Sequence, residues 1–130
     1  MSTELYYLTL VATLTALTWI PYILNTIQVR GLGNAVGYPE NPAPLAPWAQ
    51  RMKAAHYNSV ENLVVFAALV IIAHLAGVSD NATATAAMVY FWARVAHLLV
   101  YTFGIPWLRT LTFAVGYFAM LTFAWKLLAG

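Results

Sequence analysis

Residues 82–103, ATATAAMVYFWARVAHLLVYTF, decide the fold of this chain because a stretch with the length and composition of a membrane span contains an arginine. Tyr90, Arg94, His97 and Tyr101 follow one another at helical spacing and fall within a sector of roughly 60°. An arginine near the middle of a hydrocarbon span is costly unless it faces protein, water or a counter-charge. The stripe therefore predicts a polar site inside a bundle of helices.

The composition indicates an integral membrane protein. Hydrophobic residues make up 62% of the 130 residues and charged residues only 8%, whereas soluble domains carry about 25% charged residues. Without cysteine, the chain has no disulfide, no thiolate metal ligand and no cysteine nucleophile. The basic residues are scattered and the histidines lack a metal-ligand spacing, so we expect neither a nucleic-acid partner nor a metal site.

Four apolar segments, each long enough to cross about 30 Å of hydrocarbon, predict an all-α fold. We expect helices over residues 5–29, 47–76, 82–103 and 107–128. The stretch from residue 30 to residue 50 is rich in glycine and proline and predicts a loop, while the other two connections are short. One long and two short connections indicate an antiparallel four-helix transmembrane bundle, with residues 1–130 forming one domain.

The basic residues predict how this bundle lies in the membrane. Arg30, Arg51 and Lys53 flank the long loop, and Arg109 follows the last turn. The opposite end carries mainly acidic residues. The positive-inside rule then places the polar end of the bundle in the cytoplasm and both termini outside.

The helix expected over residues 47–76 brings further polar residues to that end. Arg51, Asn58, Glu61 and Asn62 share a sector of roughly 100°. Glu61 and Arg94 lie about 6 Å and 13 Å inside their spans, which predicts an ion pair that neutralises both charges.

Such an ion pair is consistent with a ligand site, and it is equally consistent with a structural contact that fixes the register of the two helices. Arg51 and Arg109 also fit an interfacial role in which they reach toward anionic headgroups. Because three helices bring polar groups of net positive charge to one end, we favour a site for an anionic ligand.

Three segments carry a resemblance to a known family. They are AHYNSVEN at residues 55–62, RVAH at residues 94–97 followed by Tyr101, and Pro106 followed by Arg109-Thr110. In this order and spacing they resemble the MAPEG family, the membrane-associated proteins in eicosanoid and glutathione metabolism. The chain is most similar to the bacterial members, which implies a multi-pass protein of a bacterial inner membrane.

The resemblance implies a homotrimer that binds glutathione between subunits near the cytoplasmic face. The glutathione-binding residues that the resemblance implies are Arg30 at the end of the first helix and, on the polar faces, Arg51, Asn58, Glu61, Arg94, His97 and Tyr101. Arg109 matches the arginine that stabilises the glutathione thiolate and is the expected catalytic residue. The implied function is a glutathione-dependent transferase or peroxidase that acts on lipophilic electrophiles arriving from the membrane.

This role for Arg109 agrees with elementary chemistry. A thiol with a pKa of about 8.5 is mostly protonated at neutral pH, and only its thiolate is a good nucleophile. A fixed guanidinium in a site that excludes water favours the charged form and lowers that pKa.

Two positions depart from the family pattern. Ala54 stands where many members have an arginine four residues before the asparagine, and Phe113 stands where a tyrosine is common. An alternative is therefore a membrane protein of this fold that is catalytically silent or binds a different anionic or thiol ligand. A small multidrug-type transporter would need an acidic residue deep in its first helix, and residues 5–28 contain none.

Overall fold

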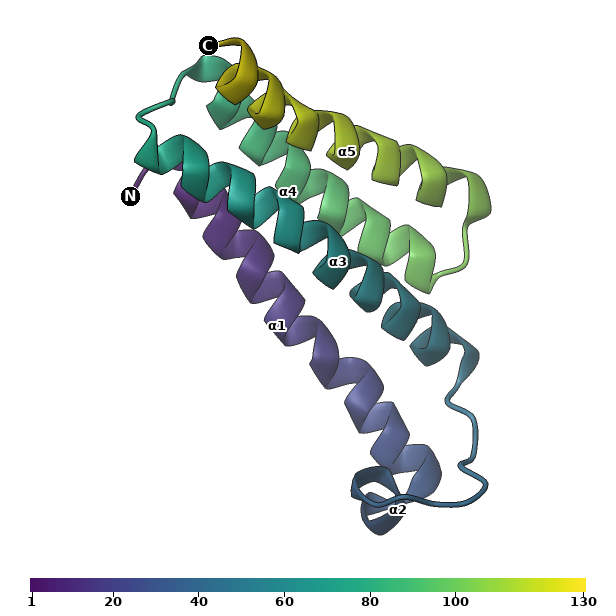
Figure 1. Ribbon diagram of the computed structural model, residues 1–130. Coiled ribbons are helices and arrows are strands. Elements are labelled where there is room, and N and C mark those ends of the chain that lie inside the picture. Colours follow the sequence, from purple (N-terminus) through teal and green to yellow (C-terminus); the bar gives the residue numbers. More distant parts are fainter.

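Four long helices and one short helix form the structure, a computed structural model that describes residues 1–130 (Figure 1). The helices are α1 (Thr3–Arg30), α2 (Leu32–Val36), α3 (Pro47–Leu75), α4 (Asn81–Thr102) and α5 (Pro106–Ala129). The four long helices begin and end within two residues of the ranges that the sequence predicts. Each is long and apolar enough to cross a membrane, so the protein is a multi-pass membrane protein.

Prolines and polar caps set where the helices begin. Pro47 and Pro106 occupy the first turns of α3 and α5, where a missing backbone N–H costs nothing. At the start of α4, the Asp80 side chain accepts from the Thr83 backbone N–H while the Thr83 hydroxyl accepts from the Asp80 N–H, forming a capping box.

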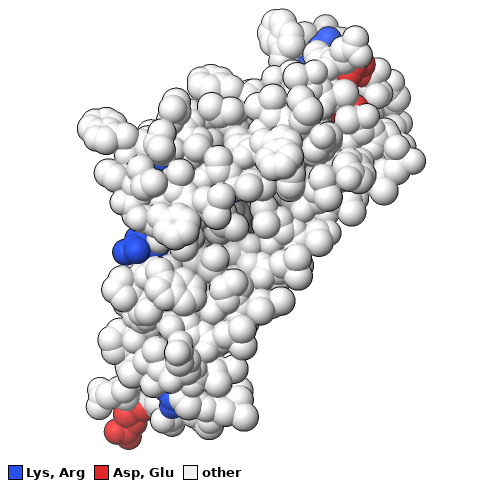
Figure 2. Space-filling view, turned by 180° about the vertical axis from the view of Figure 1, so that it is seen from behind, with Lys and Arg blue, Asp and Glu red and all other residues white.

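The long helices run antiparallel, and both termini lie at the same end of the bundle (Figure 1). α1 packs on α3 and α4, and α4 packs on α5. Toward its C-terminal end, α1 runs away from α4 and α5 and carries α2 with it (Figure 1). Most of the surface seen in Figure 2 is neither basic nor acidic, as lipid-facing surface requires.

An aromatic cluster holds α3, α4 and α5 together near the middle of the bundle. The Phe66 ring stacks on the Tyr90 ring with centroids 3.7 Å apart, and Phe123 meets Phe66 edge-on at 5.8 Å. All three side chains are fully buried. Gly116 of α5 faces α4 at this level, where an added Cβ would lie 3.7 Å from Cδ of Arg94. The small residue allows the two helices to approach closely.

A buried histidine joins α1 to α3. Nε2 of His56 lies 2.9 Å from the Thr15 carbonyl oxygen, and because a carbonyl only accepts, this nitrogen donates. With a neutral ring, the Tyr22 hydroxyl donates to Nδ1 at 2.6 Å. Trp19 packs against the same ring. The pair of hydrogen bonds fixes how α1 lies along α3.

The connection from α1 to α3 is more ordered than the predicted loop. It contains the short helix α2, and α1 holds its remainder in place through two side chains. Asn25 accepts from the Ala46 backbone N–H at 3.0 Å, and Nε of Arg30 donates to the Ala43 carbonyl at 2.8 Å. These are long-range contacts that a glycine- and proline-rich sequence does not reveal.

Replacing His56 by phenylalanine should destabilise the bundle. The substitution removes both hydrogen bonds from a buried position, so we expect a loss of about 2 kcal/mol in the free energy of unfolding, measured by denaturant titration in detergent. His74→Phe is the matched control because His74 is exposed. Equal stability of the His56→Phe and His74→Phe variants would contradict the role assigned to His56.

The capping carboxylate should make stability depend on pH. Lys126 donates to Asp80 at 2.8 Å, and this hydrogen bond, with the Thr83 backbone N–H, lowers the pKa of Asp80. A lowered folded pKa adds stability above the unfolded pKa of about 3.9, and that stability is lost as pH falls through the folded value.

Thermal melts should therefore show the wild type more stable than Asp80→Asn at pH 6, with the difference vanishing at acidic pH. A difference in melting temperature that stays constant with pH would contradict this explanation.

Candidate functional site

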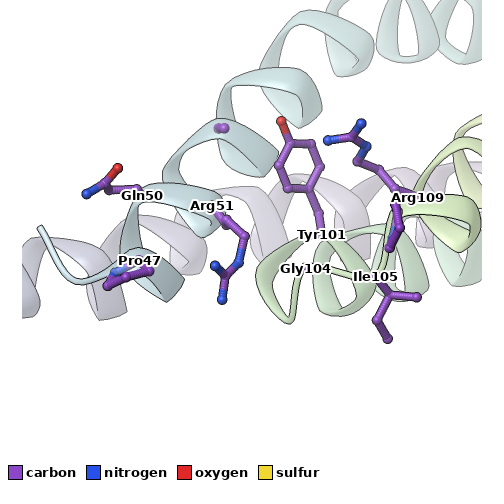
Figure 3. Close-up of a pocket in the computed structure, with 9 residues that line it drawn as sticks. Pro47, Gln50, Arg51, Tyr101, Gly104, Ile105 and Arg109 are labelled. Carbon is purple, nitrogen blue, oxygen red and sulfur yellow. The ribbon is translucent and has the colours of Figure 1, made fainter.

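A cavity of about 470 Å³ opens where the start of α3, the end of α4 and the start of α5 meet (Figure 3). We call it the outer cavity. It is lined by Pro47, Gln50, Arg51, Ala54, Tyr101, Gly104, Ile105, Pro106 and Arg109. The two prolines begin helices here, so the backbone of α3 and α5 positions the wall.

A second cavity of about 320 Å³ lies further along the same helices, toward the middle of the bundle. We call it the inner cavity. Its lining residues are Asn58, His97, Tyr101, Arg109, Thr110 and Phe113. Tyr101 and Arg109 line both cavities and stand between them.

The Arg109 guanidinium lies over the Tyr101 ring, 5.0 Å from the ring centroid. This cation–π contact holds the charge without neutralising it. The chain contains one salt bridge, between Asp80 and Lys126 at the opposite end of the bundle. Figure 3 shows the Tyr101 hydroxyl and the Arg109 guanidinium on the same side of the outer cavity. A cation without an acidic partner therefore stands between the two cavities.

Arg94 is buried beside this site, with only 2% of its surface exposed. Its Nη2 donates to the Asn58 side-chain oxygen at 2.8 Å and to the Ser59 hydroxyl at 2.9 Å. Nε and Nη1 are enclosed by protein without a hydrogen-bond partner. Its hydrogen-bond partners are neutral, so no acid of the chain neutralises this guanidinium, which lies behind Asn58 of the inner cavity and lines neither cavity itself.

The predicted Arg94–Glu61 ion pair does not form within the chain. Asn58 and Ser59 take the guanidinium instead, and Asn62, one turn further, accepts from the Tyr90 hydroxyl. This face of α3 points at α4, whereas Glu61 lies to one side of it and is exposed. The helical spacing indicates at which end of the bundle these polar residues lie. It is too coarse to say whether Glu61 or its neighbour Asn62 faces α4.

His97 is buried against the inner cavity. Its ring lies 5.5 Å from the Tyr101 ring and 6.3 Å from the Phe113 ring, between centroids, and its Nδ1 has no hydrogen-bond partner. His97 and Tyr101, two residues of the predicted stripe, thus line the same cavity.

Arg51 reaches across from α3 to the end of α4. Its Nε donates to the Thr102 carbonyl at 2.8 Å. Gly104, with φ of 75°, follows at the turn, where an added Cβ would come within 3.3 Å of that Nε. Thr102, Gly104 and Gln50 are neighbours of the site that we did not predict from the sequence. A glycine just after a helix is a visible signal for a left-handed turn, but not for a contact with a residue far away in the chain.

Arg30 lies elsewhere. It borders a small cavity of about 160 Å³ formed by the end of α1 and the following loop, and it donates to Ala43 of that loop. One chain therefore brings together Arg51, Asn58, Arg94, His97, Tyr101 and Arg109. It leaves Arg30 and Glu61 outside the two cavities.

Comparison with protein families agrees with this geometry. A model described as the MAPEG family matches residues 6–129. The chain belongs to the MAPEG family. The match spans all four long helices, so membership rests on nearly the whole chain and not only on the three motifs. Comparisons with curated proteins and with solved structures found no match.

Proposed function

We propose that this MAPEG protein is a glutathione-dependent transferase or peroxidase that activates the glutathione thiolate with Arg109. The observation that carries the proposal is the Arg109 guanidinium, which has no acidic partner and lies at the junction of two cavities. Membership of a family with many glutathione-dependent enzymes supports it.

Arg109 can supply the electrostatic part of the chemistry. A guanidinium next to the sulfur favours the thiolate, and a shift of one pKa unit in the bound thiol corresponds to about 1.4 kcal/mol. The Tyr101 ring holds the guanidinium from one side, so little reorganisation is needed when charge develops on sulfur. Because the Arg109 guanidinium is already in position, it would convert the weakly nucleophilic thiol into a strongly nucleophilic thiolate.

The electrophile would occupy the inner cavity, which shares Tyr101 and Arg109 with the outer cavity. This cavity combines polar groups at Asn58, His97 and Thr110 with the apolar ring of Phe113. The flanking outer faces of the helices carry many exposed apolar side chains, which lipid covers in the membrane. A lipophilic substrate dissolved in the bilayer would then reach the thiolate laterally.

We infer that the protein assembles as a homotrimer. Glu61 is exposed on the face of a membrane-spanning helix, and a carboxylate left in hydrocarbon is costly. A neighbouring subunit, or the ammonium group of glutathione bound between subunits, would neutralise it. Arg30 lies at the end of α1, apart from the outer and inner cavities of its own chain, and would reach the bound glutathione only across such an interface.

We also propose that the site faces the cytoplasm. Arg51 and Arg109 line the outer cavity, and Arg30 and Lys53 lie toward the same end of the bundle. This charge distribution follows the positive-inside rule and puts both termini on the outer side. Glutathione would then enter from the cytoplasm.

A second candidate function is binding of another anionic thiol without turnover of glutathione. Ala54 contributes only a methyl group to the outer cavity, and Phe113 brings no hydroxyl to the inner cavity. Both differences leave the site with fewer polar contacts than the family motif implies.

The first test is turnover with glutathione and a chlorodinitrobenzene or hydroperoxide substrate. Replacing Arg109 by alanine should lower kcat/KM by about 100-fold or more, because the charge that stabilises the thiolate is lost. The ultraviolet absorbance of bound thiolate should fall in parallel.

Lys53→Ala is the matched control, since Lys53 lies near the same end of the bundle but lines neither cavity. Unchanged turnover in Arg109→Ala would contradict the role of Arg109. A wild-type protein that binds a different thiol and leaves glutathione unreacted would favour the second candidate.

Replacing Glu61 by glutamine tests the interface. The substitution keeps the shape but removes the charge, so we expect glutathione affinity to fall about tenfold by calorimetric titration. Light scattering reports whether the trimer persists. Glu40→Gln in the exposed loop is the control. Unchanged affinity and assembly in Glu61→Gln would show that this carboxylate has no partner at an interface.

A further inference from the structure

We propose that a groove between α4 and α5 binds one acyl chain of a phospholipid whose headgroup carries a phosphate and a primary ammonium group. The Asp80–Lys126 ion pair would meet that headgroup. The groove has a volume of about 700 Å³, larger than either cavity of the candidate site. It begins at the end of the bundle that carries both termini (Figure 1), and the inference is independent of the proposed function.

Two helices supply the whole wall of this α4–α5 groove. The lining residues form one stripe on each helix and are Asn81, Ala82, Thr85, Ala86, Val89, Val115, Phe118, Ala119 and Thr122. Along α4, the distance from Asn81 to Val89 corresponds to about 12 Å at 1.5 Å per residue. One leaflet contributes about 15 Å to the hydrocarbon core of a bilayer. The groove is therefore long enough to hold most of one acyl chain.

The groove changes from polar to apolar along its length, as a phospholipid does. Asn81, Thr85 and Thr122 lie toward the start of α4, at the end of a membrane span, and Val89 and Val115 lie deeper. The amide and hydroxyl groups are at the level where the ester groups of a lipid would lie. The valines are at the level of its chain.

The polar groups at the shallow end of the groove must decide which lipid binds. Acyl chains are about as apolar as the groove wall, so the wall alone favours no particular lipid. At this end, Nζ of Lys126 lies 2.8 Å from a carboxylate oxygen of Asp80, and 36% and 44% of the two side chains are exposed. Asp80 directly precedes Asn81, and Lys126 follows Thr122 by one helical turn. The ion pair thus joins α4 to α5 at the entrance of the groove.

Both partners of this ion pair can accept a further contact. An ammonium group has three N–H donors, and a carboxylate has several acceptor positions. Lys126 can therefore also donate to a lipid phosphate, while Asp80 accepts from a lipid ammonium group. An anionic headgroup without an ammonium group would leave Asp80 unmatched and facing a like charge.

The occupant that we infer is a lipid and not another subunit. The proposed trimer interface involves Glu61 of α3 and Arg30 of α1, whereas every residue of the groove belongs to α4 or α5. The groove wall contains no charged side chain, so lipid can cover it without cost.

Native mass spectrometry of the detergent-purified protein, titrated with phospholipids of identical acyl chains, tests the headgroup preference. The wild type should bind phosphatidylethanolamine about fivefold more tightly than phosphatidylglycerol, as one exposed charge pair allows. Asp80→Asn should remove this difference, because asparagine still caps α4 but carries no charge. Phosphatidylcholine, whose quaternary ammonium group cannot donate a hydrogen bond, should bind more weakly than phosphatidylethanolamine.

A second variant tests the groove itself. Thr85 lines the groove and is exposed, so the ring of Thr85→Phe would occupy the space of the acyl chain without entering the core. We expect the affinity for phosphatidylethanolamine to fall about tenfold or more. Met88→Phe is the matched control, since Met88 is exposed on the same helix and does not line the groove. This variant should bind as the wild type does.

Photo-crosslinking gives a measurement on the unaltered protein. The probe is phosphatidylethanolamine with a diazirine in its acyl chain, diluted with unlabelled phosphatidylglycerol. Label on the segments 81–89 and 115–122 should persist under dilution, whereas label on the rest of the lipid-facing surface should fall in proportion.

The possible results have distinct meanings. Equal binding of phosphatidylethanolamine and phosphatidylglycerol by the wild type, or a preference that survives in Asp80→Asn, overturns the proposal. Uniform dilution of the crosslinks also overturns it, because the groove then holds only the lipid that surrounds any membrane protein. A wild type without bound lipid, combined with a change of oligomeric state in Thr85→Phe, would mean that another subunit fills the groove. None of these measurements involves a thiol, so the proposed function is tested separately.

Discussion

The rest of the structure depends on how the bundle accommodates the Arg94 guanidinium within a membrane-spanning helix. A charge at that depth must face the interior, which fixes which side of α4 packs against α3 and α5. Gly116 gives the side chain room on α5, and Asn58 and Ser59 of α3 accept its hydrogen bonds. Tyr90, one turn before Arg94, then reaches the aromatic cluster. The need to keep the Arg94 charge out of the lipid thus fixes how α3, α4 and α5 face one another.

Because Arg94 is held by neutral partners, positive charge remains beside the candidate site. Arg94 has only neutral hydrogen-bond partners, and the Arg109 guanidinium lies over the Tyr101 ring. Arg51 donates one hydrogen bond, to the Thr102 carbonyl. A bundle selected for stability alone would pair such groups with acids or replace them by apolar residues. Arg51 and Arg109 line the outer cavity without an acidic partner and Arg94 is buried nearby, which supports the proposal of an anionic ligand.

The helices could be predicted from the sequence because local signals mark them. Pro47, Pro106 and the Asp80 cap stand at helix starts, and the apolar runs have the length of a span. The polar end of the bundle also followed from the periodicity of α4. What could not be predicted depends on contacts between distant residues. Glu61 and Asn62 are adjacent, and only packing decides that Asn62 faces α4, just as only the fold brings Arg51 to Thr102.

The two ends of the bundle differ in how their polar side chains are arranged. Near the termini and in the middle, polar side chains pair within the chain, as in the Asp80–Lys126 ion pair and the Tyr90–Asn62 hydrogen bond, and aromatic rings fill the core. At the other end, α1 runs away from α4 and α5 (Figure 1), and the two cavities are lined by α3, α4, α5 and the turn between α4 and α5, with Arg109 exposed between them. A fully packed bundle would bury Arg109 beyond the reach of a ligand. The open junction of α3, α4 and α5 around Arg109 is therefore what the proposed ligand site requires.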